Sequence, residues 1–278
     1  MKRRNFFRTG LLGASAALVT SPFSTFAGSA PQSGTFKLNY APHFGMFKSS
    51  ASGGVLNELD FMYESGFRSM EDNGMKGRSV DEQNQIANKM EKHGMTMGVF
   101  VAHTIFWTEP NLASGKQEWR DQFLKEINES VEVAKRVNAK WMTVVPGHVD
   151  LRKDMGYQTA NVIESLKQAA AILEPHGLTM VLEPLNFRDH PGLFLTKSSQ
   201  AFEICKAVDS PSCKILFDIY HQQIQEGNLI PNIDLSWDEI AYFQVGDNPG
   251  RKEPTTGEIN YKNVFSHFAM VLIYTVLD

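Results

Sequence analysis

The sequence predicts an α/β fold, a (β/α)8 TIM barrel that is incomplete at its C-terminal end. Two observations carry this prediction: short β-rich runs alternate with longer amphipathic helices from about residue 36, and no long all-β stretch interrupts the alternation. Such a pattern requires parallel strands joined by helical crossovers. Seven strands over this length favour a barrel over an open sheet, and the lack of a GxGxxG after the first strand argues against a dinucleotide fold.

Each predicted element has its own signal in the sequence. Apolar residues at helical spacing predict a helix over residues 55–64, with Gly66 as its C-terminal stop. Ser79 starts the next helix, because Glu82 three residues later completes a capping box. An apolar stripe over residues 119–134 marks the third. Further helices are predicted at residues 163–173 and 198–208, and strands at residues 37–47 (with the loop that follows), 67–71, 95–103, 141–145, 178–182, 214–218 and 240–245.

The pattern breaks near the C-terminus. Residues 261–270 start like a seventh helix, and the apolar run 271–278 is suited to strand eight, but no covering helix follows it. The last strand and helix therefore look truncated. An uncovered apolar face favours self-association, so we expect reduced stability and a tendency to form a homo-oligomer.

The N-terminus predicts export. Residues 2–8 (KRRNFFR) form a twin-arginine pattern, and the apolar run at residues 11–19 is well short of the roughly 20 residues that span a bilayer. Small residues offer cleavage after Ala27 or Ala30. We therefore expect a twin-arginine signal at residues 1–30, a barrel domain at residues 31–278, a periplasmic protein and no stable membrane span.

The composition limits the partners. The chain has 278 residues, a net charge of -4 and 42% hydrophobic residues, so it can bury a large core but lacks the basic balance that nucleic-acid binding calls for. We therefore expect no nucleic-acid partner. Export would permit a disulfide between Cys205 and Cys213, but two buried thiols are favoured because one lies in a predicted helix and the other at the start of a strand.

Polar residues recur where the late strands end. In a (β/α) barrel such positions face the active-site mouth. Glu183 and Asp218 each follow three apolar residues, where a charge is costly to bury unless it is paired or bound to metal. Gln244 lies at the end of the next predicted strand, and Glu258 lies beyond that strand in the segment Thr256-Gly257-Glu258. Any one of them alone has a structural explanation, such as an ion pair or a strand cap. Together, carboxylates with an amide oxygen suit a divalent cation, Mg²⁺ or Mn²⁺.

Four ordered blocks resemble the hydroxypyruvate isomerase family, a branch of the xylose-isomerase-like barrels (the sugar phosphate isomerase/epimerase superfamily) to which the ketose 3-epimerases also belong. They are residues 183–186 (EPLN), 217–221 (FDIYH), 244–251 (QVGDNPGR) and 257–261 (GEINY). The resemblance covers about residues 36–262. It implies metal ligation by Glu183, Asp218, Gln244 and Glu258, substrate contacts by His221 and Arg251, and support of Glu183 by Asn186.

The resemblance also implies the reaction. It is a metal-dependent interconversion of an aldose/ketose-type pair by proton transfer through an enediolate, most simply hydroxypyruvate to tartronate semialdehyde. We expect Glu183 and Glu258 to lie on opposite sides of a small hydroxy-carbonyl or sugar substrate, one removing the proton and the other returning it. The divalent cation would stabilise the enediolate charge. Ketose 3-epimerases usually have His where Gln244 stands, so Gln favours the isomerase branch.

Two other functions remain open at this stage. A DNA-repair nuclease of the same superfamily is opposed by the acidic charge and the export signal. A non-catalytic periplasmic sugar-binding barrel, or a truncated inactive remnant, would bind ligand without turnover. His43, His103, His148 and the Glu71-Asp72-Asn73 cluster also lie near predicted strand ends, but no spacing fixes their roles.

Overall fold

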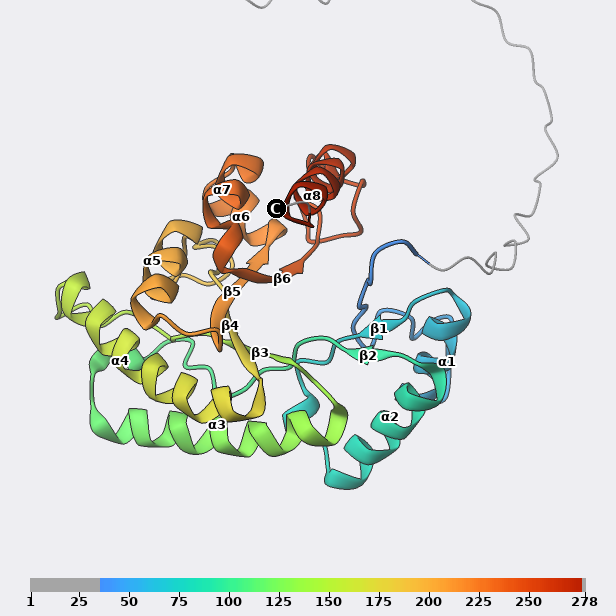
Figure 1. Ribbon diagram of the computed structural model, residues 1–278, viewed down its shortest axis with the longest axis horizontal. Coiled ribbons are helices and arrows are strands. Elements are labelled where there is room, and N and C mark those ends of the chain that lie inside the picture. Colours follow the sequence, from blue (N-terminus) through green and yellow to red (C-terminus); the bar gives the residue numbers. More distant parts are fainter. Residues whose placement is uncertain (1–35, 277–278) are drawn as a thin grey trace, which may run out of the picture. The chain divides into compact units, whose positions relative to one another are not determined.

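Short parallel strands lie among longer helices in the computed structural model, which describes residues 36–276 (Figure 1). The predicted export signal at residues 1–30 lies outside the described residues. The strands are β1 (Ser69–Met70), β2 (Thr96–Met97), β3 (Trp141–Val144), β4 (Thr179–Leu182), β5 (Cys213–Asp218) and β6 (Ile240–Gln244). The helices are α1 (Val55–Glu64), α2 (Val80–His93), α3 (Gln117–Val137), α4 (Met155–Leu173), α5 (Ser198–Val208), α6 (Ile219–Gln225), α7 (Leu229–Ser236) and α8 (Tyr261–Val276).

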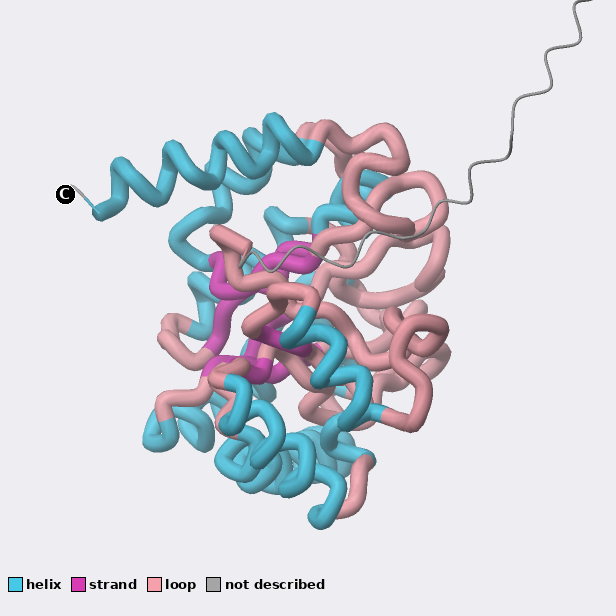
Figure 2. The backbone as a smooth tube through the Cα atoms, turned by 90° about the vertical axis from the view of Figure 1, so that its right-hand side faces the viewer, coloured by secondary structure: helices cyan, strands magenta, loops and turns pink. Residues whose placement is uncertain are grey.

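The strands run in chain order around the barrel. β1 pairs with β2, and β3, β4, β5 and β6 form a second sheet, with every pair parallel. Isolated parallel bridges from Met97 and Val101 connect the β2 region to the β3 region. Figure 2 shows the strands with helices on either side of them. The predicted α/β alternation with parallel strands is confirmed.

Local signals set the helix ends as predicted. α1 spans the predicted residues, and the backbone N–H of Gly66 donates to the carbonyl of Tyr63 just beyond its end. At α2, the Ser79 hydroxyl accepts from the backbone N–H of Glu82, and the Glu82 carboxylate accepts from the Ser79 N–H. These two bonds satisfy donors that the first helical turn leaves free. Gly94 ends α2 with a left-handed conformation.

Two layers of apolar packing hold the barrel together. The larger lies between the strands and the outer helices, and the two cysteines are buried free thiols within it, as predicted. The smaller lies inside the barrel, where Val99, Val181 and Leu216 contact one another. Trp141 and Tyr242 close this inner layer, with ring centroids 5.7 Å apart. Filled layers of this kind make the interior a packed core rather than a pore.

Two predicted strands take other forms. The segment predicted as a first strand makes only a parallel bridge, between His43 and Glu71. The prediction of strand eight in residues 271–278 is wrong for its described part, because the backbone continues as helix α8 to Val276. α8 contacts both edges of the strand series: the Phe268 ring packs at a tilt against Phe243 of β6, with centroids 4.5 Å apart, and Phe265 lies against Tyr40. No described helix combines the length and the apolar character needed to cross a bilayer.

Candidate active site

The inner apolar layer determines which strand-end side chains meet. Side chains two positions apart on a strand point to the same face. Glu183 follows inward-facing Val181, Asp218 follows Leu216, and Gln244 follows Tyr242. Asp218 and Gln244 are also register partners on β5 and β6. The three polar groups therefore form the next layer, above the apolar one, at the carboxyl ends of the strands.

Three of the described side chains come together in this layer. Glu183, Asp218 and His221 each offer a ligand atom, and these atoms lie within 4.8 Å of one another. His221 Nε2 is 3.6 Å from Asp218 Oδ2 and 4.0 Å from Glu183 Oε1. The Asp218 and His221 side chains are buried, and that of Glu183 is only 12% exposed. The structure therefore brings the two strand-end carboxylates, Glu183 and Asp218, together, with His221 as a third member of the group.

Asp218 uses its two oxygens differently. Oδ1 accepts from the backbone N–H groups of Tyr220 and His221, at 2.8 and 3.3 Å, and so caps α6 directly at the end of β5. Oδ2 faces the site and accepts from Arg251 Nη2 at 3.0 Å. One oxygen therefore fixes the helix start while the other stays available to the site.

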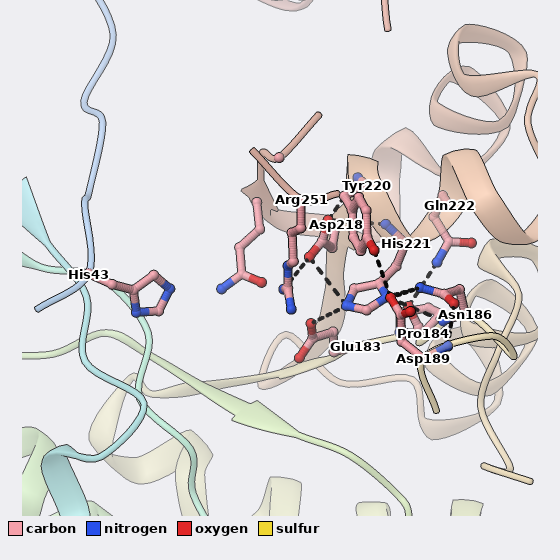
Figure 3. Close-up of polar contacts among 12 residues, drawn as sticks. His43, Glu183, Pro184, Asn186, Asp189, Asp218, Tyr220, His221, Gln222 and Arg251 are labelled. Carbon is pink, nitrogen blue, oxygen red and sulfur yellow. Dashed lines mark hydrogen bonds and ion pairs between the residues drawn. The ribbon is translucent and has the colours of Figure 1, made fainter. Parts of the chain in front are cut away.

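The hydrogen bonds of Asn186 fix the tautomer of His221 (Figure 3). The Asn186 amide oxygen accepts from the backbone N–H groups of Arg188 and Asp189, so its NH₂ group must face the other way. That NH₂ donates to His221 Nδ1 at 2.7 Å, and the Asn186 backbone N–H also points to Nδ1, at 3.3 Å. Nδ1 is thus an acceptor, and the neutral ring carries its proton on Nε2.

His221 consequently presents an N–H donor to the site. Nε2 is buried and has no hydrogen-bond partner in the part of the chain that the structure describes. Desolvation by burial lowers the pKa of His221 to about 4, which keeps the ring neutral, and Asp218 opposes this shift. An Nε2–H group donates to an oxygen but has no lone pair to give a metal. This geometry matches the predicted substrate contact of His221 better than metal ligation.

Glu183 carries the largest mismatch of charge and environment in the site. Burial, and after it the charge of Asp218, raises the pKa of Glu183 to about 8. Two ionised carboxylates that are this close and shielded from solvent repel each other unless a positive charge lies between them. A divalent cation fits this need and this oxygen-donor set. Arg251 offsets only part of the repulsion, and its side chain is 51% exposed.

Gln244 contacts a residue to which the sequence assigned no role. Its amide Nε2 donates to both oxygens of Glu71, at 3.3 and 3.2 Å. Glu71 follows β1, is buried, and also accepts from His43 Nε2 at 2.8 Å. Burial would lower the pKa of His43, but the hydrogen bond and charge of Glu71 outweigh burial and raise it. The same two-residue rule that selects Glu183 also selects Glu71, two positions after Ser69 on β1.

Two predicted residues lie elsewhere or have other partners. Glu258 is exposed, and its carboxylate accepts from Asn248 Nδ2 at 2.6 Å and from Gln223 Nε2 at 3.4 Å. The structure therefore does not bring Glu258 into the described carboxylate group, because amides of its own loop and of α6 hold it. Asn186 supports His221 rather than Glu183, as shown above. The predicted ligand role of Glu258 stays a prediction.

The remaining candidate histidines have structural contacts. His103 is buried, its Nδ1 bonds to the Thr104 carbonyl, and its Nε2 accepts from the Val145 N–H. Burial lowers the pKa of His103 to about 4, so it is a neutral hydrogen-bonding core residue. His148 Nδ1 bonds to the carbonyl of Val149.

Comparisons with known proteins place this geometry in a family. The xylose isomerase-like TIM barrel family matches residues 59–271. The 2-oxo-tetronate isomerase of Cupriavidus necator is 31% identical over 183 residues, covering 65% of this chain and 70% of that protein. The hydroxypyruvate isomerase of Escherichia coli is 30% identical over 233 residues, covering 79% and 87%.

A solved structure extends the similarity to three dimensions. The structure of an AP endonuclease, family 2, from Brucella melitensis has a TM-score of 0.71 at 25% identity, over 83% of this chain and 86% of that one. The residues that match the family, 59–271, include every strand that the structure describes, together with Glu183, Asp218, Gln244 and Glu258. The chain therefore belongs to the xylose isomerase-like TIM barrel family.

Proposed function

We propose that this protein is a divalent-metal-dependent isomerase that interconverts a small 2-keto hydroxy acid, such as hydroxypyruvate or a 2-oxo-tetronate, with its isomeric aldehyde or ketone. The observation that carries the proposal is the pair of nearly buried carboxylates, Glu183 and Asp218, beside a fixed histidine N–H donor. The names of the two relatives supply the substrates to be tried first. The net acidic charge of the chain opposes a nuclease.

Glu183 is the proposed proton carrier. Isomerisation moves a proton between adjacent carbons, and a general base works best when its pKa lies near the working pH. In the metal-free protein, burial and the charge of Asp218 raise the pKa of Glu183 toward this range, and a bound cation would lower it and keep the carboxylate ionised, as a base must be. A cation bound by Glu183, Asp218 and Gln244 would polarise the substrate carbonyl and stabilise the negative charge that develops on it. Glu258 is proposed as the second ligand and proton carrier, which requires its carboxylate to leave Asn248.

His221 and Arg251 are the proposed substrate contacts. Among residues 36–276 the Nε2–H of His221 has no hydrogen-bond partner, and it points toward the carboxylate pair, so it can donate to a carbonyl or hydroxyl oxygen of the substrate. The Arg251 guanidinium can pair with the carboxylate of a keto acid by parallel N–H donors. Its half-exposed position suits a group that meets an incoming ligand.

Turnover of defined substrates tests the proposal. Hydroxypyruvate, 2-oxo-tetronates and small ketoses are each incubated with the protein and Mn²⁺ or Mg²⁺ in D₂O, and products are identified by NMR. We expect isomer formation with deuterium at the exchanged carbon, and loss of both in Glu183→Gln. Epimerised ketose would assign the protein to ketose 3-epimerisation instead. Ligand binding without deuterium uptake would identify a non-catalytic binder and refute the proposal.

We also propose export by the twin-arginine route, from the pattern at residues 2–8. Replacing Arg3 and Arg4 together by Lys should retain the protein in the cytoplasm of a host with this pathway, while the unchanged protein reaches the periplasm. Cell fractionation and immunoblotting measure the distribution. Equal distribution of the two forms would contradict export by this route.

A further inference from the structure

The orientation of the Gln244 amide determines whether this residue can serve a cation. A side-chain amide has an oxygen that can ligate a metal and an NH₂ group that cannot. The two ends have nearly the same size, so only the neighbouring hydrogen bonds select which end faces the site. In this structure the selecting neighbour is Glu71.

Glu71 accepts hydrogen bonds and donates none when it is ionised. Both of its oxygens lie within 3.3 Å of Gln244 Nε2. A flipped amide would place its oxygen against this carboxylate, and two acceptors would repel each other. The bonded orientation leaves the Gln244 oxygen pointing away from Glu71, on a residue whose register partner is Asp218.

Other donors hold the Glu71 carboxylate in place. His43 Nε2 lies 2.8 Å from Oε1, and the Tyr242 hydroxyl donates to Oε2 at 3.3 Å. Gly98 makes room for this arrangement, because a Cβ atom there would collide with the Tyr242 hydroxyl and press against Glu71. His43 comes from the segment before β1 and Tyr242 from β6, so donors from two separate segments fix the Glu71 oxygens.

We propose that Glu71 is a positioning residue that turns the Gln244 oxygen toward the cation site of Glu183 and Asp218, with His43 and Tyr242 holding Glu71. The proposal rests on the metal site of the proposed function. It assigns a role to a buried acid that lies outside the group of Glu183, Asp218 and His221. Outer partners that orient a ligand in this way typically change metal affinity by about 10- to 100-fold when they are removed.

Metal affinity is the direct measurement. Mn²⁺ is titrated into the metal-free full chain by isothermal calorimetry and by electron paramagnetic resonance of free Mn²⁺. Glu71→Gln keeps the size of the side chain but lets the Gln244 amide take either orientation, so we expect about 10- to 100-fold weaker Mn²⁺ binding. The exchanged pair, Glu71→Gln with Gln244→Glu, keeps the hydrogen bond with reversed roles and keeps an oxygen for the cation. We expect this double variant to regain affinity.

Glu239→Gln is the matched control. Glu239 is another buried carboxylate, but it pairs with Lys206 and Lys214 before β6 begins. Its replacement should leave Mn²⁺ affinity unchanged. Affinity of Glu71→Gln equal to wild type would overturn the positioning role alone, as would equal losses in both single variants or no recovery in the exchanged pair. No Mn²⁺ binding by the wild type would instead overturn the metal site and, with it, this inference.

Discussion

The raised pKa of Glu183 predicts that the metal-free protein is destabilised by its own active site. The pKa of this carboxyl rises from 4.5 in the unfolded chain to about 8 in the folded one. The folded state therefore holds a proton that the unfolded state releases. The contribution of Glu183 to the free energy of unfolding is fully present below pH 4.5. It falls as the pH rises from 4.5 and is lost once the pH has passed through about 8. Glu183→Gln keeps the shape and removes the titration.

The size of the effect follows from the interval between the two pKa values. Within this interval, each pH unit lowers the free energy of unfolding of the wild type by about 1.4 kcal/mol. The free energy of unfolding of Glu183→Gln relative to wild type should therefore rise by roughly 2 to 3 kcal/mol between pH 5 and pH 7. Because the side chain is only 12% exposed, solvent screening reduces this little.

Urea unfolding followed by circular dichroism, in EDTA at pH 5, 6 and 7, measures the difference. Contributions of titrating groups that are distant from Glu183 cancel between the two proteins. Glu239→Gln again serves as a control, with the opposite sign: it breaks close contacts to two lysines and should lower stability at pH 7. A wild type and a Glu183→Gln variant whose stability difference does not change with pH would refute the reasoning.

Three further predictions concern the surroundings of the site. Gly98→Ala should lower the free energy of unfolding by about 1–3 kcal/mol, measured by urea denaturation, because the new methyl group overpacks against the Tyr242 hydroxyl; an unchanged value would contradict the close approach. Asn186→Ala should remove the 2.7 Å amide donor to His221 Nδ1 and leave only the backbone N–H at 3.3 Å, cost about 1–3 kcal/mol and give mixed ring tautomers in ¹⁵N NMR, whereas a single Nε2–H tautomer would show that the Asn186 side chain does not select it. Ser79→Ala should cost about 1 kcal/mol by loss of the α2 cap without affecting Mn²⁺ affinity, and a change in that affinity would argue against a purely local role.

Sequence patterns predicted the ends of the early helices better than the extent of the strands, although the short helices α6 and α7 were not predicted. Helical spacing and caps gave α1 and the start of α2, because these signals act within one turn of chain. The apolar run at residues 95–103 predicted a long strand, yet ladder pairing covers only Thr96–Met97. The chain then bonds to neighbours on both sides through single contacts, such as Val99 with the Asp72 N–H. Such contacts depend on barrel curvature, which a local pattern does not encode.

The same distinction applies to the site. The strand-end rule found Glu183 and Asp218, because a buried carboxylate after an apolar run is a local signal. It did not separate Glu71 from its polar neighbours Asp72 and Asn73, although counting two positions from Ser69 selects Glu71. The tautomer of His221 depends on Asn186, 35 residues earlier in the chain, so no local spacing predicts it.

No loop separates β5 from α6, so the barrel wall is connected directly to the helix that carries His221. Asp218 ends the strand and caps the helix within the same residue. Replacing it by Ala would remove an oxygen proposed to bind the cation and, at the same time, release the first turn of α6, which carries His221. Loss of cation binding in such a variant would therefore combine two effects, the missing oxygen and the missing helix cap. Asp218→Asn can keep Oδ1 as the acceptor that caps α6 and replace Oδ2 by an NH₂ group. This substitution separates the anchoring of the helix from the proposed binding of the ion.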